Sequence, residues 1–168
     1  MMFPAALMAK AEALLEVCRA RELKLATAES CTGGLVAGII TSIAGASDVF
    51  TAGFVTYSNS AKITLLHVEP GIIAAHGGVS EATACAMAEG ALSATEAKIA
   101  LAVTGIAGPD GGSMQKPVGL VHIAAARRDV TTLHRKLLLG DCGREEIRLQ
   151  AVAEILSLGL AQAESGAP

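Results

Sequence analysis

Apolar residues along this chain follow two kinds of spacing, and each spacing predicts one kind of element. Short apolar runs rich in β-compatible residues predict strands over residues 24–28, 50–57 and 98–104. Longer stretches place their apolar residues three or four positions apart, which is typical of helices with one buried face. These predicted helices cover residues 5–21, 33–44, 59–66, a stretch that Ser80 caps and Glu81 begins, and 143–163.

The remaining segments complete the predicted fold. Residues 118–126 and 130–138 are predicted to be the two strands of a hairpin. Residues 105–117 are too rich in Gly and Pro for regular structure, and residues 70–78 are predicted to be a connector with room for one helical turn. Because helices alternate with strands before the hairpin, we predict an α/β fold: a single-domain mixed β-sheet flanked by α-helices on both faces.

Composition narrows the class of protein. A length of 168 residues favours one domain, which we place at residues 1–168. Hydrophobic residues make up 52% and charged residues 17%, which indicates a compact globular chain, and no apolar run is long enough to span a bilayer. A net charge of −3 and an aromatic content of 2% argue against nucleic acid as a partner.

Cysteine and histidine usage bears on location and on metals. The four cysteines form no C-x-x-C pair, and the N-terminus has no signal pattern, which together indicate a reduced, cytoplasmic protein. The four histidines are scattered without the spacing of metal ligands. We therefore expect no structural metal.

A serine at a predicted strand-to-helix turn is the first candidate for chemistry. Ser30 and Cys31 come just after the predicted strand at 24–28. A hydroxyl at such a turn has free backbone N–H groups nearby and feels the positive end of the helix. That setting suits an anion, or the oxyanion formed when the hydroxyl attacks a carbonyl. The backbone donors we expect there belong to Cys31, Thr32, Gly33 and Gly34.

Ser30 needs a neighbouring group that takes its proton. No G-x-S-x-G motif surrounds it and no Ser…Asp…His order is evident, so Lys62 is the candidate base. A partly desolvated lysine has a lowered pKa, and Ser-Lys pairs are a known variant of nucleophilic catalysis. The alternative makes Ser30 a helix cap and Lys62 a surface charge. Cys31 is a rival nucleophile because a helix N-terminus lowers the pKa of a thiol, unless it is simply buried.

The end of the predicted strand at 98–104 offers residues that can hold a ligand. Thr104 places a hydroxyl there, at the start of the segment V-T-G-I-A-G-P-D-G-G. Loops at the carboxyl ends of strands line ligand crevices in α/β sheets. Glycines such as Gly105 and Gly108 let backbone N–H groups approach a phosphate, while Asp110 is either a turn residue or a carboxylate that binds a hydroxyl.

An arginine opens the last predicted helix. Arg144 stands in G-D-C-G-R-E-E-I, where its guanidinium can reach a ligand phosphate with two parallel hydrogen bonds. The alternative is a salt bridge to Glu145, to Glu146 or to a neighbouring loop. Sequence alone leaves these two interpretations open.

Three motifs together resemble one known family. The segments A-E-S-C-T-G-G, Y-S-N-S-A-K and V-T-G-I-A-G-P-D-G-G…K-P-V-G are similar, in this order, to the CinA C-terminal domain family. This is the family of nicotinamide mononucleotide deamidases, also called PncC-type nicotinamide-nucleotide amidases. The resemblance covers nearly the whole chain, and the three motifs in order are far more specific than any one alone. Many family members carry an additional N-terminal domain, and the resemblance here is to the stand-alone form.

The resemblance implies an amidohydrolase. The family is α/β, cytoplasmic, metal-independent, without cofactor and usually oligomeric, so we expect a homo-oligomer that acts on a pyridine mononucleotide. Its activity converts nicotinamide mononucleotide to nicotinic acid mononucleotide and ammonia by hydrolysis of the carboxamide. Some relatives are known only as competence- or damage-inducible proteins, which keeps open a second function, that of a non-catalytic nucleotide-binding or regulatory module.

The resemblance also implies roles for matching residues. The family's serine and lysine correspond to Ser30 and Lys62, and its motif tyrosine corresponds to Tyr57. Ser30 would attack the carboxamide carbon with Lys62 as general base, and Lys62 or Tyr57 would protonate the leaving ammonia. The family's loop threonine corresponds to Thr104 and its late arginine to Arg144, which we expect to contact the ribose and phosphate.

Overall fold

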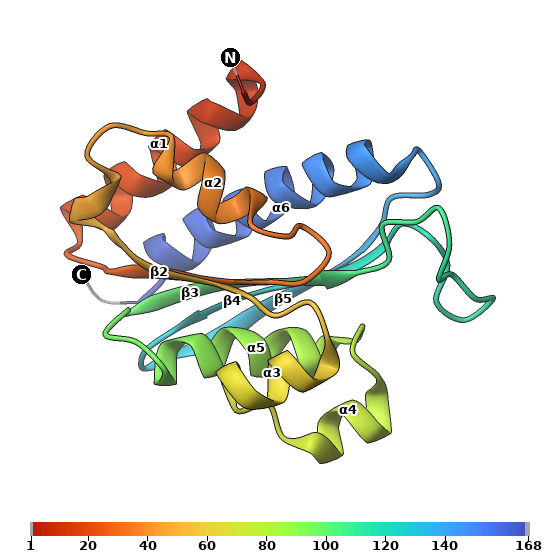
Figure 1. Cartoon of the computed structure of the whole chain (residues 1–168). Coiled ribbons are helices and arrows are strands. Elements are labelled where there is room, and N and C mark those ends of the chain that lie inside the picture. Colours follow the sequence, from red (N-terminus) through yellow and green to blue (C-terminus); the bar gives the residue numbers. More distant parts are fainter. Residues whose placement is uncertain (1, 167–168) are drawn as a thin grey trace.

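A five-stranded sheet forms the middle layer of the protein, whose computed structural model describes residues 2–166 (Figure 1). The strand order is β2-β1-β3-β4-β5. β1 pairs in parallel with β2 and β3, whereas β4 is antiparallel to both β3 and β5. The sheet is therefore mixed, and the predicted hairpin is confirmed. The strands are β1 (Leu25–Glu29), β2 (Phe50–Val55), β3 (Ile99–Gly105), β4 (Leu120–Arg127) and β5 (Val130–Leu138).

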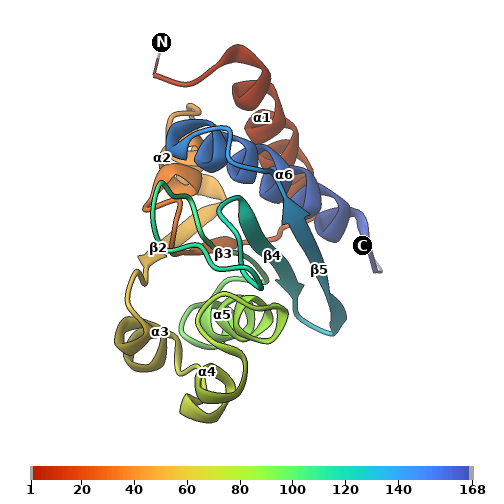
Figure 2. The ribbon, with the colours of Figure 1, turned by 90° about the vertical axis from the view of Figure 1, so that its right-hand side faces the viewer.

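Helices cover both faces of the sheet, which confirms the predicted α/β architecture. Figure 2 shows the same two helical layers from the side, with α1, α2 and α6 on one face and α3, α4 and α5 on the other. Among residues 2–166, no helix combines the length and the apolar character that a bilayer crossing requires. The helices are α1 (Ala5–Ala20), α2 (Leu35–Thr41), α3 (Asn59–Leu66), α4 (Pro70–His76), α5 (Glu81–Ser93) and α6 (Arg144–Glu164), with a 3₁₀ turn η1 at Ala46–Asp48.

Two hydrophobic cores lie on the two faces and differ in side-chain size. The core under α1, α2 and α6 contains large aliphatic residues such as Leu14, Ile39 and Ile155. The core under α5 is built mainly from alanines of the helix and of the sheet. Small side chains let helix and sheet backbones approach closely. Two helices of this layer also come close together at Gly90 of α5, where an added Cβ would overlap the backbone oxygen of Leu66 in α3.

Two predicted elements differ from the structure. The connector predicted at 70–78 contains a seven-residue helix, α4, which begins with Pro70 at a position where a helix needs no N–H donor. The helix predicted at 33–44 begins only at Leu35 and ends at Thr41. Gly33 and Gly34 have φ values of +60° and +98°, a left-handed backbone that cannot belong to a right-handed helix.

Candidate active site

A pocket of about 360 Å³ opens where the carboxyl ends of β1, β2 and β3 meet. Ser30 follows β1 directly, Tyr57 comes two residues after β2, and Thr104 lies at the end of β3. Lys62 reaches the pocket from α3 and Arg144 from the start of α6. The fold thus gathers side chains from five segments at the edge of the sheet where α/β proteins commonly bind ligands.

Ser30 and Lys62 form a close pair in this pocket. The hydroxyl of Ser58 accepts the N–H of Ala61 at 3.0 Å and starts α3, which carries Lys62. Lys62 Nζ lies 3.1 Å from Ser30 Oγ, and the two side chains are 2% and 8% exposed. Lys62 is therefore not a surface charge. Nor is Ser30 the cap of α2, because that position is Gly34.

The surroundings of Lys62 favour its neutral form. Burial lowers the pKa of Lys62 below the ordinary lysine value, because the ammonium loses its hydration. Besides the Ser30 hydroxyl, Nζ contacts the carbonyl oxygens of Thr56 at 3.0 Å and Tyr57 at 3.2 Å. Carbonyls only accept, whereas a hydroxyl can donate. As the structure stands, Nζ donates to Ser30 Oγ, and Ser30 Oγ donates to the Tyr57 carbonyl at 3.4 Å. An amine that has lost its proton can keep its two N–H groups on the carbonyls and turn its lone pair to the Ser30 hydroxyl.

Cys31 has the opposite environment from the one a reactive thiol needs. Burial raises the pKa of its thiol to about 11, although hydrogen bonding to its own backbone acts in the other direction. A thiol with that pKa stays protonated near neutral pH and is a poor nucleophile. Of the two interpretations of Cys31 that the sequence left open, its burial favours the simply buried residue over the rival nucleophile.

A buried carboxylate occupies the start of α2. Glu29 is 1% exposed and accepts three backbone hydrogen bonds of 2.8–3.0 Å. Sequence analysis assigned Glu29 no role, although an acidic residue just before a helix start is a known stabilising arrangement. The three donors are the N–H groups of Gly34, Val36 and Ala37.

Only part of the expected set of free N–H groups remains. The Gly34 N–H is bonded to Glu29, and the Gly33 N–H donates to the carbonyl of Ser30 at 3.0 Å. The expectation of free donors at these two glycines is therefore wrong. Throughout residues 2–166, the N–H groups of Cys31 and Thr32 donate to no other residue. Of these two residues only Cys31 lines the pocket, whereas Thr32 is fully buried outside it, so the Cys31 N–H is the donor left for an oxyanion.

Tyr57 contributes two different atoms to the pocket. Its carbonyl oxygen accepts from Lys62 and lies 3.4 Å from Ser30 Oγ. Its hydroxyl, on a side chain that is 59% exposed, accepts from Arg144 Nη2 at 3.2 Å. Arg144 Nη1 donates to the carbonyl of Gly108 at 2.7 Å, so the arginine ties Tyr57 to the glycine-rich loop. In the described part of the chain, Arg144 forms no salt bridge with a glutamate.

The predicted site residues divide into those that line the pocket and those that do not. Thr32, Gly33 and Gly34 lie outside it and shape the turn behind Ser30. The nine that line it are Ser30, Cys31, Tyr57, Lys62, Thr104, Gly105, Gly108, Asp110 and Arg144.

Sequence analysis missed some lining residues. Asn59 lies inside the motif Y-S-N-S-A-K, and its place beside Lys62 in that motif was a usable signal. Gly78 and Val79 had no such signal, because they enter the pocket only through tertiary contacts. Thr104 donates its hydroxyl to the Gly78 carbonyl at 2.6 Å, which fixes that segment against β3.

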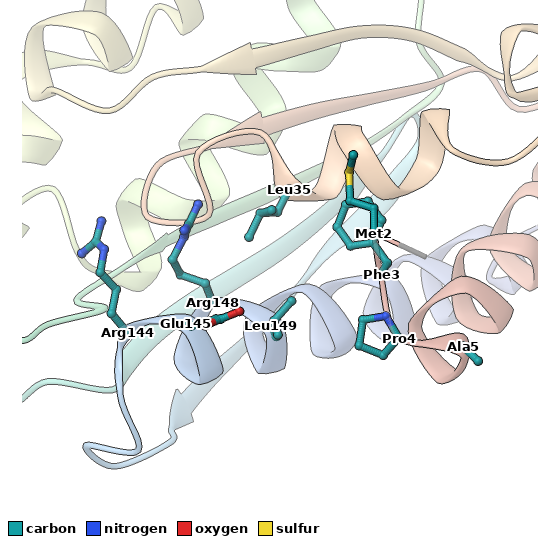
Figure 3. A pocket seen from close by; sticks show the side chains of 9 residues that line it. All are labelled: Met2, Phe3, Pro4, Ala5, Leu35, Arg144, Glu145, Arg148 and Leu149. Atoms are coloured by element: carbon teal, nitrogen blue, oxygen red, sulfur yellow. The ribbon is translucent and has the colours of Figure 1, made fainter.

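A larger pocket of about 840 Å³ lies on the other side of Arg144, between the first residues of the chain and the starts of α2 and α6 (Figure 3). Its walls are apolar at Phe3, Leu35 and Leu149. Neither Ser30 nor Lys62 lines it, so the reactive groups belong to the smaller pocket. Among residues 2–166, no three His, Cys, Asp or Glu side chains are grouped to hold a metal ion.

The fold and this pocket define an α/β protein with a buried serine–lysine pair at the carboxyl edge of a mixed sheet. Residues 8–162 match the family model described as the CinA C-terminal domain, and the chain belongs to that family. A solved structure, that of the competence/damage inducible protein CihA from Agrobacterium tumefaciens, is similar with a TM-score of 0.95 and 46% identity. It covers 98% of this chain and 99% of that one.

Two curated relatives illustrate the range of the family. The nicotinamide-nucleotide amidohydrolase PncC of Escherichia coli (strain K12) is 48% identical over 151 residues, which are 89% of this chain and 90% of that protein. A CinA-like protein of Anaeromyxobacter sp. (strain Fw109-5) is 50% identical over 139 residues, 83% of this chain but 33% of that protein. This chain thus spans about a third of the length of such longer relatives.

Proposed function

We propose that this protein hydrolyses the carboxamide of nicotinamide mononucleotide to give nicotinic acid mononucleotide and ammonia. The observation that carries the proposal is the 3.1 Å contact of Lys62 Nζ with Ser30 Oγ, in a setting that lowers the pKa of the lysine. The name of the E. coli relative, which matches nearly end to end at 48% identity, supports the substrate. A cytoplasmic location and self-association stay predictions.

The proposed mechanism uses Ser30 as nucleophile and Lys62 as the proton carrier. Lys62 takes the hydroxyl proton as Ser30 Oγ attacks the carboxamide carbon, and the N–H group of Cys31 stabilises the oxyanion. The resulting ammonium of Lys62 protonates the departing nitrogen, which leaves as ammonia. Water then attacks the acyl-enzyme ester, Lys62 accepts its proton, and Ser30 is regenerated as the acid product departs.

Lys62 is the better proton donor of the two that sequence analysis considered. Its Nζ already contacts Ser30 Oγ, whereas the hydroxyl of Tyr57 is bonded to Arg144. We assign Tyr57 two positioning tasks in the proposal: its carbonyl orients the lysine, and its hydroxyl holds the arginine. A merely structural tyrosine would be replaceable by phenylalanine without loss of turnover.

We assign recognition of the phosphate to Arg144. In residues 2–166 its guanidinium contacts only a carbonyl and a hydroxyl, both uncharged, and no carboxylate neutralises it. A phosphate oxygen offers a stronger, charge-assisted hydrogen bond than either neutral acceptor. The loop at 105–112 lies beside it, since Arg144 is bonded to Gly108, and its backbone can approach the ribose.

Release of ammonia from nicotinamide mononucleotide by the purified protein tests the proposal. We expect ammonia and nicotinic acid mononucleotide in equal amounts, and none with Ser30→Ala. Calorimetric binding of the nucleotide without any turnover would contradict the proposal and favour the alternative, a nucleotide-binding or regulatory module. Absence of both binding and turnover would leave neither function standing.

A further inference from the structure

We propose that Arg148 is a positioning residue for the reaction, which aims the oxyanion donor at Cys31 by holding the carbonyl groups of the turn that follows Ser30. The idea rests on the proposed function, because it assigns a task within that mechanism. It goes beyond that mechanism in naming a side chain outside the pocket that the reaction depends on. Arg148 lies in none of the three sequence motifs, and it lines the larger pocket of Figure 3 rather than the one that holds Ser30.

Arg148 lies on α6, four residues after Arg144, and is half-buried. Its Nε donates to the carbonyl of Cys31 at 3.1 Å, and its Nη2 donates to the carbonyl of Thr32 at 2.9 Å. In Figure 3 its side chain ends at the turn before α2, whereas the side chain of Arg144 ends to one side of that turn. Across residues 2–166, no carboxylate forms an ion pair with Arg148, so its charge faces these two peptide groups.

Because each peptide group is planar, a contact that fixes its C=O also fixes the direction of its N–H. In a trans peptide the C=O and the next N–H point in opposite directions, and the peptides of this turn are trans. Because the Cys31 carbonyl faces Arg148, the Thr32 N–H points away from it. The Thr32 carbonyl accepts from Arg148 at 2.9 Å and also from the Leu35 N–H at 3.3 Å, and together these two bonds set the direction of the Gly33 N–H.

The direction of the Cys31 N–H depends on one additional hydrogen bond. The Gly33 N–H donates to the Ser30 carbonyl at 3.0 Å, so the Ser30–Cys31 peptide is fixed as well. The Cys31 N–H, on the other side of that peptide, therefore points away from Gly33. Cys31 lines the catalytic pocket with Ser30, which places this donor beside the nucleophile.

Glu29 and Arg148 hold the turn from two chemically opposite sides. The carboxylate takes the N–H groups at the start of α2, and the guanidinium takes the carbonyls of Cys31 and Thr32. Between them, in the part of the chain from 2 to 166, the Cys31 N–H donates to no other residue and lies at the pocket. A cation on the carbonyl side also polarises each peptide and makes its N–H a stronger donor.

Kinetics of Arg148→Met, Arg148→Lys and a matched control test the inference. Removal of one oxyanion donor typically costs about 10²–10³-fold in kcat, and misdirected donors cost part of that. We expect Arg148→Met to lower kcat roughly 10- to 100-fold with less than about a threefold change in KM, and Arg148→Lys to recover part of the loss. The control is Arg135→Met, which removes an exposed arginine that pairs with Glu154 at 2.7 Å, outside the pocket lining, and should leave kcat unchanged.

A merely structural role gives a different pattern. Equal losses in Arg148→Met and Arg135→Met, or a rise in KM with kcat unchanged, would overturn the positioning role. If Arg148→Met does not fold, Arg148→Lys carries the test by itself, because it keeps the charge but cannot span both carbonyls. In that variant an unchanged kcat is the overturning result.

A serine-directed fluorophosphonate separates this inference from the choice of substrate. Ser30 Oγ forms a bond to phosphorus, fluoride leaves, and Lys62 takes the hydroxyl proton, while the P=O oxygen occupies the oxyanion position. Intact mass should show labelling of the wild type, none of Ser30→Ala, and labelling of Arg148→Met slowed by about tenfold or more.

The outcomes distinguish the two ideas. Slowed labelling of Arg148→Met without any ammonia release from nicotinamide mononucleotide would support the positioning role and reject the proposed substrate. Labelling of Arg148→Met at the wild-type rate would reject the positioning role alone. No labelling of the wild type would reject an activated Ser30, and the positioning role with it.

Discussion

Lys62 and His122 are both basic side chains buried on the α5 side of the sheet, yet their surroundings differ in kind. Burial lowers the pKa of each, that of His122 to about 4. Lys62 faces a hydroxyl in a pocket, whereas His122 Nδ1 lies 2.9 Å from His134 Nε2, with the two rings stacked and Glu81 behind them. A lowered pKa therefore does not by itself mark a catalytic base; a nucleophile and space for a substrate must accompany it.

The largest effect on turnover is expected for the serine, because it is the nucleophile beside Lys62. Ser30→Ala should lower kcat by about 10⁴–10⁶-fold, the usual cost of removing a covalent nucleophile, while the fold and nucleotide binding stay nearly intact. Ammonia release and calorimetry measure the two properties. His122→Gln is the matched change in the other cluster and should keep nearly full turnover. Retained activity in Ser30→Ala together with lost activity in Cys31→Ala would show that the thiol is the nucleophile.

The second prediction concerns the lysine as a base. Lys62→Arg should lose about 10²–10⁴-fold in kcat, because arginine keeps the charge but cannot accept a proton near neutral pH. In the wild type, kcat/KM should rise with pH through the lowered pKa of Lys62, since only the neutral amine takes the Ser30 proton. A pH series of initial rates measures this. Full activity in Lys62→Arg, or a flat profile on the acid side, would reject the base role.

The third prediction is that His122 affects how the stability of the fold depends on pH. His122 has an ordinary pKa of 6.5 and a folded-state pKa of about 4, so between these values the unfolded chain binds more protons. The contribution of His122 to the free energy of unfolding is therefore complete above pH 6.5. It decreases by up to roughly 3 kcal/mol as the pH falls to 4. Urea unfolding at pH 7 and 4.5 should show a smaller loss in His122→Gln than in the wild type. Parallel losses in both proteins would contradict the assignment.

The smallest expected effect belongs to the pocket's exposed cation. Arg144→Ala should weaken binding of the mononucleotide by about 1.5–3 kcal/mol, the range for hydrogen bonds to charged groups. The phosphate-free nucleoside should be affected much less. Titrations in a Ser30→Ala background measure both ligands without turnover. Equal losses for the two would mean that Arg144 acts structurally, through Gly108 and Tyr57.

The fold was predictable where apolar patterns are strong. The strand predicted at 98–104 appears as Ile99–Gly105, because a run buried on both faces can be recognised in the sequence. The helix α4 was not predictable in the same way. None of its residues is buried, so no apolar periodicity marks it.

The residue types of the candidate site were predictable from the sequence. The contacts that hold the turn after Ser30 in place were not. Ser30 and Lys62 stand in recognisable motifs, and the structure brings them within 3.1 Å. The contacts of Glu29 with α2 depend on how Gly33 and Gly34 turn the chain, which residue types alone do not specify. Arg148 is still harder to foresee, because it reaches Cys31 from 117 positions away along the chain.

The contact at Gly90 limits how this sequence can vary. Any side chain there would push α3 away from α5 at Leu66, one helical turn from Lys62. Even alanine, the mildest replacement, would shift the lysine relative to Ser30. Libraries of random variants selected for turnover should therefore retain glycine at position 90, although this residue touches no substrate. Variants selected only for solubility should tolerate small residues there, so the two selections would assign different importance to the same position.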